Sequence, residues 1–307
     1  MPFFLGIDGG GTKTRCVIGD EKSVLGSGSG SGCNIVRLGE ACARDSLSSA
    51  IHEACVQAGV SPRQISRTCA GLSGAADDGI ASLAQRLLIE IIGGAIEVIG
   101  DMEIALESAF GGGPGVIMIA GTGSIAYGRN KKGESVRAGG WGRVISDEGS
   151  GHWIGLHAIK AALRECDLGK QCGLLGELMT SLGANDVHDL AVQANADPLP
   201  EFAPLFPLVV AAAENGDPVA IDVLTRAGHE LAETAAAVTG RLFRDSDSAA
   251  IATHGGVFAG STRVRKAFIA ELKRRCPIAC PMECEVNPVM GALDRARREF
   301  GVWHRRG

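Results

Sequence analysis

The sequence predicts an α/β protein built from two similar domains, and three observations support this fold class. The chain has 307 residues, of which 45% are apolar, so it is long enough for two domains that each bury a core. Strand patterns alternate with helix patterns, as in doubly wound α/β layers. The succession of strand, Gly/Thr turn and strand occurs at residues 4–18 and again at 116–129. An internal repeat of this kind indicates a duplicated fold.

The remaining elements of the first domain follow in order. After the first hairpin, a third short strand with glycines leads into a Gly/Ser run at residues 26–32, which we expect to be a substrate-facing loop rather than a linker. Apolar residues at helical spacing predict helices at 40–58 and 80–91. Strands are expected at 66–72 and 97–101. This domain spans residues 1–110 and is completed by a C-terminal helix, 291–307.

The second domain, residues 111–290, begins at a glycine-rich stretch that suits a hinge (111–115). Its hairpin is followed by a glycine-rich loop and a helix at 152–165. Residues 174–244 are helical by pattern, with polar breaks, and form an insertion. A strand at 249–257 ends in a glycine pair, and a basic helix runs from about 287 to 298.

Charge and cysteine content exclude several classes of function. The formal net charge of −5 argues against a nucleic-acid or membrane-surface partner. Because the sequence shows neither a leader nor a membrane-spanning apolar run, we expect a cytoplasmic protein. The ten cysteines have no disulfide spacing. Cys276, Cys280 and Cys284 recur every fourth residue but include no CxxC pair, so packing and loop positions are favoured over a metal site.

The two Gly/Thr turns are candidate phosphate sites. In the first, bare backbone N–H groups suit phosphate oxygens and the preceding carboxylate of Asp8 suits a hydrated Mg²⁺; its other members are Gly10, Gly11, Thr12 and Lys13. The alternative is a hairpin turn without a ligand. The second turn consists of Gly121, Thr122 and Gly123. Two such hairpins facing one another across a cleft would hold a polyphosphate from both sides.

Further polar residues stand where strands are predicted to end. Asp101 follows an apolar strand, at the edge where open α/β sheets bind ligands, and would accept a hydroxyl proton during phosphoryl transfer; alternatively it caps the next helix. Gly255 and Gly256 allow a nucleotide base to lie against backbone, although a tight turn explains them equally. A small polyol would suit Asn34, Ser73, Asp101, Asp147 and Glu148, and Trp141 would cover an apolar or N-acetyl face. Each of these residues is alternatively a surface turn, a cap or a core residue.

Six motifs in order give the chain a family resemblance. They are residues 6–14 (GIDGGGTKT), 70–74 (AGLSG), 119–124 (IAGTGS), 139–142 (GGWG), 147–150 (DEGS) and 254–257 (HGGV). The pattern resembles the superfamily of sugar kinases, actin and heat-shock chaperone ATPases. Within it, the chain is similar to the BadF/BadG/BcrA/BcrD-type ATPase family and most of all to its N-acetylglucosamine kinase members.

The resemblance implies two duplicated ribonuclease-H-like domains around a central nucleotide and sugar cleft. It implies ATP and Mg²⁺ as cofactors, a homodimer, and phosphorylation of the 6-hydroxyl of an amino sugar, first N-acetylglucosamine and next glucosamine, with N-acetylmuramic acid left open. Asp101 would be the general base. Asp8, Gly10, Gly11, Thr12 and Lys13 would form the first phosphate loop, Gly121, Thr122 and Gly123 the second, and Gly255 and Gly256 would border the adenosine. The sugar would contact Asn34, Ser73, Asp101, Gly140, Trp141 and Asp147.

One departure and three alternatives stand beside this interpretation. Many relatives have Asn before the aspartate and Ala after it, whereas this chain has Gly100 and Met102. Activators of 2-hydroxyacyl-CoA dehydratases belong to the same family, but they have a cysteine beside the second domain's loops that is absent here. Repressor-type glucokinases hold zinc with closely spaced cysteines, which the four-residue spacing does not match. A non-catalytic sugar sensor would be expected to lose Asp101 or a phosphate loop, and neither is lost.

Overall fold

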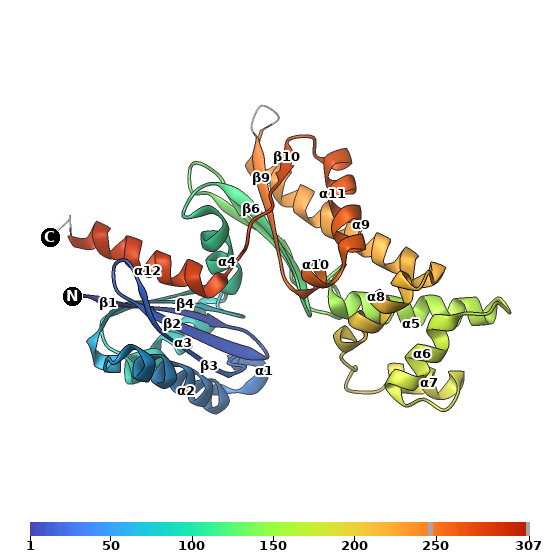
Figure 1. The fold of residues 1–307 in the computed structure, drawn as a ribbon, viewed down its shortest axis with the longest axis horizontal. Helices are drawn as coiled ribbons and strands as arrows, with labels where there is room; N and C mark the ends of the chain where they lie inside the picture. Colours follow the sequence, from blue (N-terminus) through green and yellow to red (C-terminus); the bar gives the residue numbers. More distant parts are fainter. Residues whose placement is uncertain (245–247, 305–307) are drawn as a thin grey trace. The chain divides into compact units, whose positions relative to one another are not determined.

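The computed structural model describes residues 1–244 and 248–304 (Figure 1). Within these ranges, it describes side chains as far as residue 298. It divides into two compact units, and each is described separately. Unit 1 comprises Met1–Gly113 and Cys284–Gly307, and unit 2 comprises Pro114–Glu283. The chain passes between them after Gly113 and after Glu283, where the sequence predicted the boundaries after residues 110 and 290. No helix of the described residues is both long and apolar enough to cross a membrane.

Unit 1 is built on a five-stranded sheet in the order β3 (Val24–Ser31), β2 (Lys13–Gly19), β1 (Phe3–Gly9), β4 (Ile65–Leu72) and β5 (Ala95–Gly100). The first three strands form an antiparallel meander, and β4 and β5 run parallel to β1. Therefore β1, β3, β4 and β5 all point the same way. Their carboxyl ends meet at one edge of the sheet, the edge at which α/β proteins bind ligands.

Two layers of helices bury the sheet of unit 1 (Figure 1). The short α1 (Ile35–Leu38), α2 (Glu40–Ala58), the 3₁₀ turn η1 (Pro62–Gln64) and α3 (Asp78–Ile91) belong to one side, where Leu5 and Ile7 of β1 join an aliphatic core. On the other side, α4 (Asp101–Phe110) and α12 (Pro288–His304) pack with Phe4 of β1. Alternate residues of β1 thus serve opposite cores, because strand side chains point to alternate faces.

The Gly/Ser run at residues 26–32 is strand rather than a substrate-facing loop, so that prediction is wrong. Most of the run lies in β3, which is paired with β2. Gly26, Gly28 and Gly30 all face α2, where an added Cβ would collide with the helix backbone. Alternate glycines therefore let the helix approach the strand directly, a recognised use of glycine within sheets.

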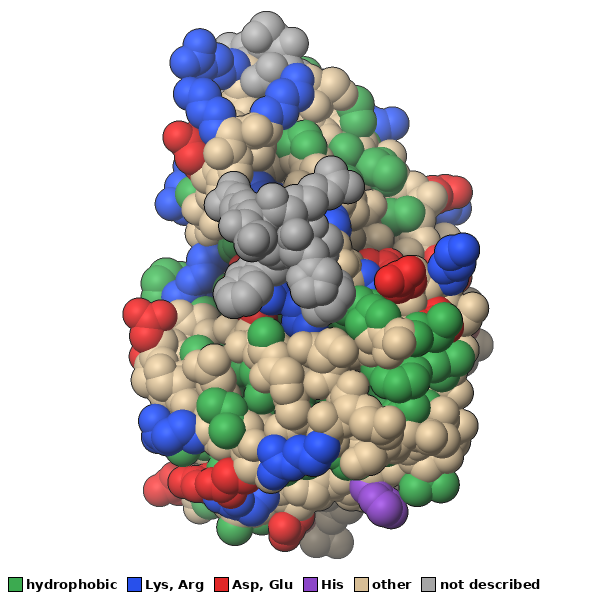
Figure 2. Space-filling model, turned by 90° about the vertical axis from the view of Figure 1, so that its left-hand side faces the viewer, with side chains coloured by type: hydrophobic (Ala, Val, Ile, Leu, Met, Phe, Trp, Pro, Cys, Tyr) green, Lys and Arg blue, Asp and Glu red, His purple; other side chains and the backbone are tan. Residues whose placement is uncertain are grey.

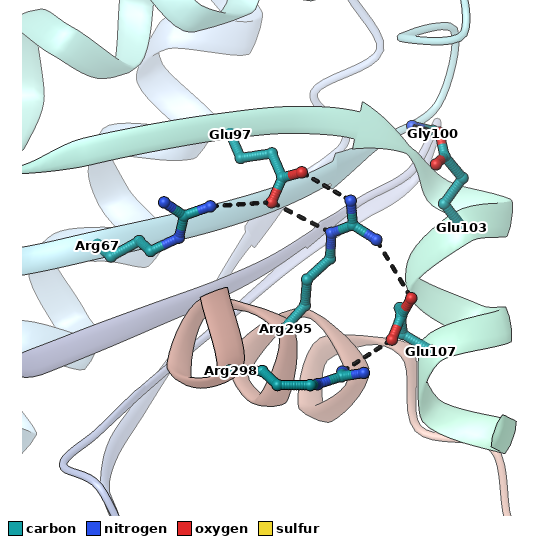
Figure 3. A network of polar contacts seen from close by, with 7 residues as sticks. All are labelled: Arg67, Glu97, Gly100, Glu103, Glu107, Arg295 and Arg298. Carbon is teal, nitrogen blue, oxygen red and sulfur yellow. Dashed lines mark hydrogen bonds and ion pairs between the residues drawn. The ribbon is translucent and has the colours of Figure 1, made fainter. Parts of the chain in front are cut away.

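The C-terminal helix α12 braces the strand that leads to Asp101 (Figure 3). Its Arg295 makes a bidentate ion pair with Glu97 of β5, with N–O distances of 2.7 and 3.1 Å. Arg295 and Arg298 also pair with Glu107 of α4, at 3.2 and 2.8 Å. The carboxylate of Glu107 is buried, so these charge-assisted bonds hold three elements in one arrangement.

Unit 2 repeats the sheet of unit 1. Its order is β8 (Ser135–Gly139), β7 (Ser124–Arg129), β6 (Gly115–Ala120), β9 (Ala249–His254) and β10 (Ala279–Pro281). Again three strands form an antiparallel meander and two more run parallel to the first of them. The identical order and direction confirm the predicted duplication and the α/β fold class.

Seven helices and a 3₁₀ turn complete unit 2 in its described part. They are α5 (Gly151–Asp167), α6 (Gly173–Leu182), α7 (Val187–Ala194), η2 (Ala203–Leu205), α8 (Phe206–Glu214), α9 (Pro218–Leu242), α10 (Gly256–Gly260) and α11 (Thr262–Arg275). The predicted helical insertion is therefore present from α6 to α9. The long α9 covers the sheet and packs against α11 (Figure 1), burying alanine and leucine side chains.

The remaining features of the fold are the charged side chains at the surface (Figure 2) and the cysteines. Figure 2 shows basic and acidic side chains interspersed on the face that it draws. None of the ten cysteines forms a disulfide. In the described residues, no group of three or more His, Cys, Asp or Glu side chains is placed to hold a metal, and of the three cysteines spaced by four, Cys276 is buried while Cys280 is exposed.

Candidate functional site

The first phosphate loop connects β1 to β2 and turns its carbonyls inward. The N–H of Gly10 donates to the carbonyl of Lys13 at 3.0 Å, while Cys33 donates to Gly10 (3.0 Å) and Ser73 to Gly9 (2.8 Å). The N–H groups of Gly11 and Thr12 find no acceptor among the described residues. A tight turn with outward N–H groups is an anion-binding concavity.

The second loop, Gly121–Thr122–Gly123, has the same construction in unit 2. Its carbonyls are bound by the N-terminus of α5: Gly151 donates to Gly121 at 2.8 Å and His152 to Thr122 at 3.3 Å. Gly121 also donates to Gly123 at 2.9 Å, whereas the N–H groups of Thr122 and Gly123 have no acceptor in the described part of the chain. Both predicted loops therefore leave donors available for phosphate oxygens.

Asp8 and Asp101 lie close enough to influence each other. The pKa of Asp8 is raised from 3.8 to about 6, first by burial and second by the nearby Asp101 carboxylate. The guanidinium of Arg15 acts in the opposite direction. Burial also raises the pKa of Asp101, against hydrogen bonds from the N–H of Met102 and from Ser73. A carboxylate whose pKa lies nearer neutrality is a more effective general base.

Asn34, Ser73 and Asp101 lie next to one another. Nδ2 of Asn34 donates to Oγ of Ser73 at 3.2 Å, and the Ser73 side chain is close enough to Asp101 to lower the pKa of its carboxyl group. Ser73 and Asp101 directly follow β4 and β5, and Asn34 stands three residues after the end of β3. Three elements whose carboxyl ends share an edge thus bring together three predicted sugar-binding residues.

The backbone around Asp101 accounts for the departure from the family pattern. Asp101 is the first residue of α4, preceded by Gly100, whose N–H donates to Glu103 at 3.2 Å (Figure 3). A Cβ on Gly100 would lie 3.1 Å from Cε of the buried Met102. The glycine therefore makes room for the methionine.

Gly32 and Arg37 lie beside the first phosphate loop, although no sequence motif predicted them there. Gly32 packs against the backbone of Gly11, and any side chain there would clash with it. The exposed Arg37 places Nη1 3.5 Å from the position of a Cβ on Gly11. Its guanidinium has no acceptor in the described part of the chain, and its backbone N–H donates to Oδ1 of Asn34 at 3.0 Å.

Asp147 lies against the second phosphate loop. It is buried, its φ is +67°, and its Oδ2 is 2.8 Å from the position of a Cβ on Gly123. Burial raises its pKa, and the nearby backbone N–H groups of Ser124 and Gly142 act in the opposite direction. The alternative role of capping α5 is wrong, since Ser150 caps that helix through a 3.1 Å bond from the N–H of Trp153.

Trp141 belongs to an exposed segment that follows β8. Trp141 is 64% exposed, and Val144 and Ile145 are 77 and 78% exposed. The guanidinium of Arg137 lies 4.1 Å from the centroid of the Trp141 ring. Gly140, with φ of +69°, packs on Ile125. Exposed large apolar side chains in one loop are candidates for contact with a ligand or partner.

Gly255 lies between β9 and α10, Gly256 is the first residue of α10, and a cavity lies near the end of that helix. Gly255 has φ of +106° and approaches the backbone of Ala120 so closely that only glycine fits. The cavity, of about 580 Å³, opens among α8, α9 and α11 and was not foreseen from the sequence. Its lining includes Val210, Ala213, Leu224, Ser261, Lys266 and Ala267.

The carboxylates of unit 1 suit a hydrated magnesium ion. Mg²⁺ is usually held by one or two carboxylates with waters and substrate phosphates completing the shell. Asp8 receives no hydrogen bond from the described residues, and its raised pKa shows that its negative charge is poorly compensated. A cation beside the first phosphate loop would supply that compensation.

Comparison with known proteins places the chain in a family. It is 34% identical to the N-acetylmuramic acid/N-acetylglucosamine kinase of Clostridium acetobutylicum, over 97% of this chain and 99% of that protein. It is 29% identical to the N-acetyl-D-glucosamine kinase of Dictyostelium discoideum, over 94% and 96%. The solved structure of a proposed N-acetylglucosamine kinase of Chromobacterium violaceum superposes with a TM-score of 0.78 at 27% identity, over 95% of this chain and 98% of that one. A profile of the BadF/BadG/BcrA/BcrD ATPase family matches residues 5–294, and the chain belongs to that family.

Proposed function

We propose that the protein transfers the γ-phosphoryl group of ATP to the 6-hydroxyl of an amino sugar, N-acetylglucosamine first and glucosamine next. The observation that carries this proposal is the Asn34–Ser73–Asp101 cluster, which follows three strands of unit 1 at the same edge as Asp8 and the first phosphate loop. Sugar hydroxyls are bound by paired amide, hydroxyl and carboxylate groups of this kind. The names of the relatives in Clostridium and Dictyostelium support the same substrate class.

In the proposed reaction, Asp101 accepts the proton of the 6-hydroxyl. The freed oxygen forms a bond to the γ-phosphorus, the bond to the β–γ bridging oxygen breaks, and ADP leaves with that electron pair. Asn34 and Ser73 position the sugar. The loop containing Gly10, Gly11, Thr12 and Lys13 and the loop Gly121–Gly123 donate N–H groups to the phosphates. Asp8 would hold Mg²⁺ through water, and the ion would neutralise phosphate charge.

We further propose that the adenosine enters the cavity among α8, α9 and α11, bordered by Gly255 and Gly256. Ser261 ends α10, begins α11 and lines that cavity, so the glycine pair and the cavity belong to one segment of chain. Its apolar walls of Val210, Leu224 and Ala267 suit a purine, and a few polar groups at the rim would fix its orientation. Gly140, Trp141 and Asp147 are proposed to complete the sugar site.

The test of this function is ADP release with Mg²⁺-ATP and a panel of sugars: glucose, glucosamine, mannose, N-acetylglucosamine and N-acetylmuramic acid. A strong preference for one amino sugar supports the proposal. Slow ATP hydrolysis that no sugar accelerates would instead favour an ATPase activator or a sugar sensor. We also propose a cytoplasmic homodimer, which light scattering of the purified chain and fractionation of cells would test.

A further inference from the structure

Three side chains of unit 2 connect the exposed segment around Trp141 to the second phosphate loop. We call residues 140–149, between β8 and α5, the Trp141 loop. From it, Arg143 donates from Nη1 to Oε2 of Glu201 at 3.1 Å and from Nη2 to the carbonyl of Leu199 at 3.0 Å. The other carboxylate oxygen of Glu201 lies 2.8 Å from Nδ1 of His152. Arg143, Glu201 and His152 therefore form one bridge.

The far end of this bridge holds the phosphate loop itself. His152 is the second residue of α5, and its backbone N–H donates to the carbonyl of Thr122 at 3.3 Å. The Thr122 carbonyl and the N–H of Gly123 belong to one planar peptide unit, so this bond also fixes the direction of that N–H. A displacement of His152 would therefore change how the N–H groups of Thr122 and Gly123 are presented.

His152 has a feature that packing alone does not explain. Its side chain is 1% exposed, and Nε2 has no hydrogen-bond partner among the described residues. Leaving such an atom unsatisfied costs about 1–3 kcal/mol. A buried polar atom without a partner calls for an explanation, and such atoms are expected at functional or strained sites.

The near end of the bridge belongs to a loop whose tip is exposed, although Ile145 and Ser146 donate to the carbonyl of Gly142 at 3.2 and 2.9 Å. Trp141, Val144 and Ile145 are 64, 77 and 78% exposed, and Arg143 stands between them with its guanidinium fixed by Glu201. Burial disfavours the charge on Glu201, but hydrogen bonds and the nearby His152 and Arg143 lower its pKa overall. The carboxylate thus remains ionised at neutral pH.

We propose that the Arg143–Glu201–His152 bridge couples sugar binding at the Trp141 loop to nucleotide binding at the second phosphate loop. This inference rests on the proposed function, in which Trp141 contacts the sugar and Thr122 the nucleotide. A sugar bound at the Trp141 loop would hold Arg143 in the arrangement described above, and through Glu201 and His152 the bridge would hold the backbone of Thr122. The nucleotide then binds a loop that no longer has to be ordered, which is positive cooperativity. Glu201 is accordingly a positioning residue.

The experiment measures the affinity for N-acetylglucosamine by calorimetry, with and without a non-hydrolysable ATP analogue and Mg²⁺. For the unmodified protein, we expect the analogue to raise sugar affinity about fivefold or more, within the usual range of coupling between sites. Glu201→Gln should reduce that factor towards one and change sugar affinity in the absence of nucleotide less than about twofold. Arg143→Gln, at the more exposed end of the bridge, should do the same, and the double variant should add nothing further.

Glu165→Gln is the matched control. Glu165 lies on α5, the helix of His152, and forms a partly exposed ion pair with Lys170 at 3.0 Å, away from the bridge. It should retain the full coupling. Coupling that survives in both Glu201→Gln and Arg143→Gln, or that is absent from the unmodified protein, would overturn the inference while leaving the kinase proposal intact. If the unmodified protein binds no amino sugar, the proposed function fails and the inference fails with it.

Discussion

Replacing Asp8 with asparagine is expected to stabilise unit 1 at neutral pH and to abolish sugar phosphorylation. Asp8 is partly buried, receives no hydrogen bond from the described residues and lies near a second carboxylate, Asp101. Its ionised form is therefore disfavoured in the folded state relative to the unfolded chain. Asparagine has nearly the same shape but no charge, so the substitution removes that cost together with the ligand for Mg²⁺.

The size of the effect follows from the pKa. A rise from 3.8 to about 6, at about 1.4 kcal/mol per pKa unit, destabilises the folded protein by about 3 kcal/mol once Asp8 is ionised. The sign is that of a raised carboxyl pKa: the native state binds the proton more tightly, so stability falls as pH rises from about 4 to about 6. Asp8→Asn should therefore gain about 3 kcal/mol at pH 7.5 but only about 1 kcal/mol at pH 4.5.

The assay must report on unit 1 alone, because two units need not unfold together. Hydrogen–deuterium exchange of peptides from β1 and β4, measured against urea at both pH values, gives the free energy of opening of that unit. Asp20→Asn is the control of opposite sign: the N–H groups of Lys22 and Ser23 donate to Asp20 and lower its pKa, so its loss should destabilise. An Asp8→Asn protein that is less stable at pH 7.5, or equally stabilised at both pH values, would refute the electrostatic reasoning.

Three further substitutions test the site and its support. Asp101→Asn should lower kcat by about 10²–10⁴ while sugar affinity by calorimetry stays within a few-fold, since only the proton acceptor is lost; normal turnover would remove Asp101 as the base. Arg37→Gln should raise the KM for ATP about tenfold and leave the KM for sugar nearly unchanged, because its guanidinium lies beside the first phosphate loop; an effect confined to the sugar would place Arg37 on the other substrate. Glu107→Gln should destabilise unit 1 by about 3 kcal/mol in urea unfolding, because it leaves Arg295 and Arg298 without their buried partner (Figure 3); a change below about 0.5 kcal/mol would mean that the network adds nothing to stability.

Local patterns were sufficient to predict much of this protein. Alternating apolar residues and glycine turns identified both hairpins, and their recurrence predicted the duplicated sheets that the structure contains. Asp8 and Asp101 were predicted as site residues because both stand where an apolar strand ends, at the edge of the sheet where open α/β proteins bind ligands. Net charge and the helical pattern of residues 174–244 likewise depend only on nearby residues, so the sequence reveals them directly.

The tertiary structure decided what depends on residues distant in the sequence. The composition of the Gly/Ser run predicts a loop, yet most of the run pairs with β2 as a strand, and its glycines are explained by the close approach of the α2 backbone. Arg37 and Glu201 have no motif of their own, because a guanidinium beside Gly11 or a carboxylate between Arg143 and His152 exists only after the chain has folded. Burial, which raises the pKa of Asp8 to about 6, is likewise produced by packing. The sequence by itself determined most of the elements and the chemical groups that they carry, because both depend on neighbouring residues. The packing of distant segments decided which side chains meet and at what electrostatic cost.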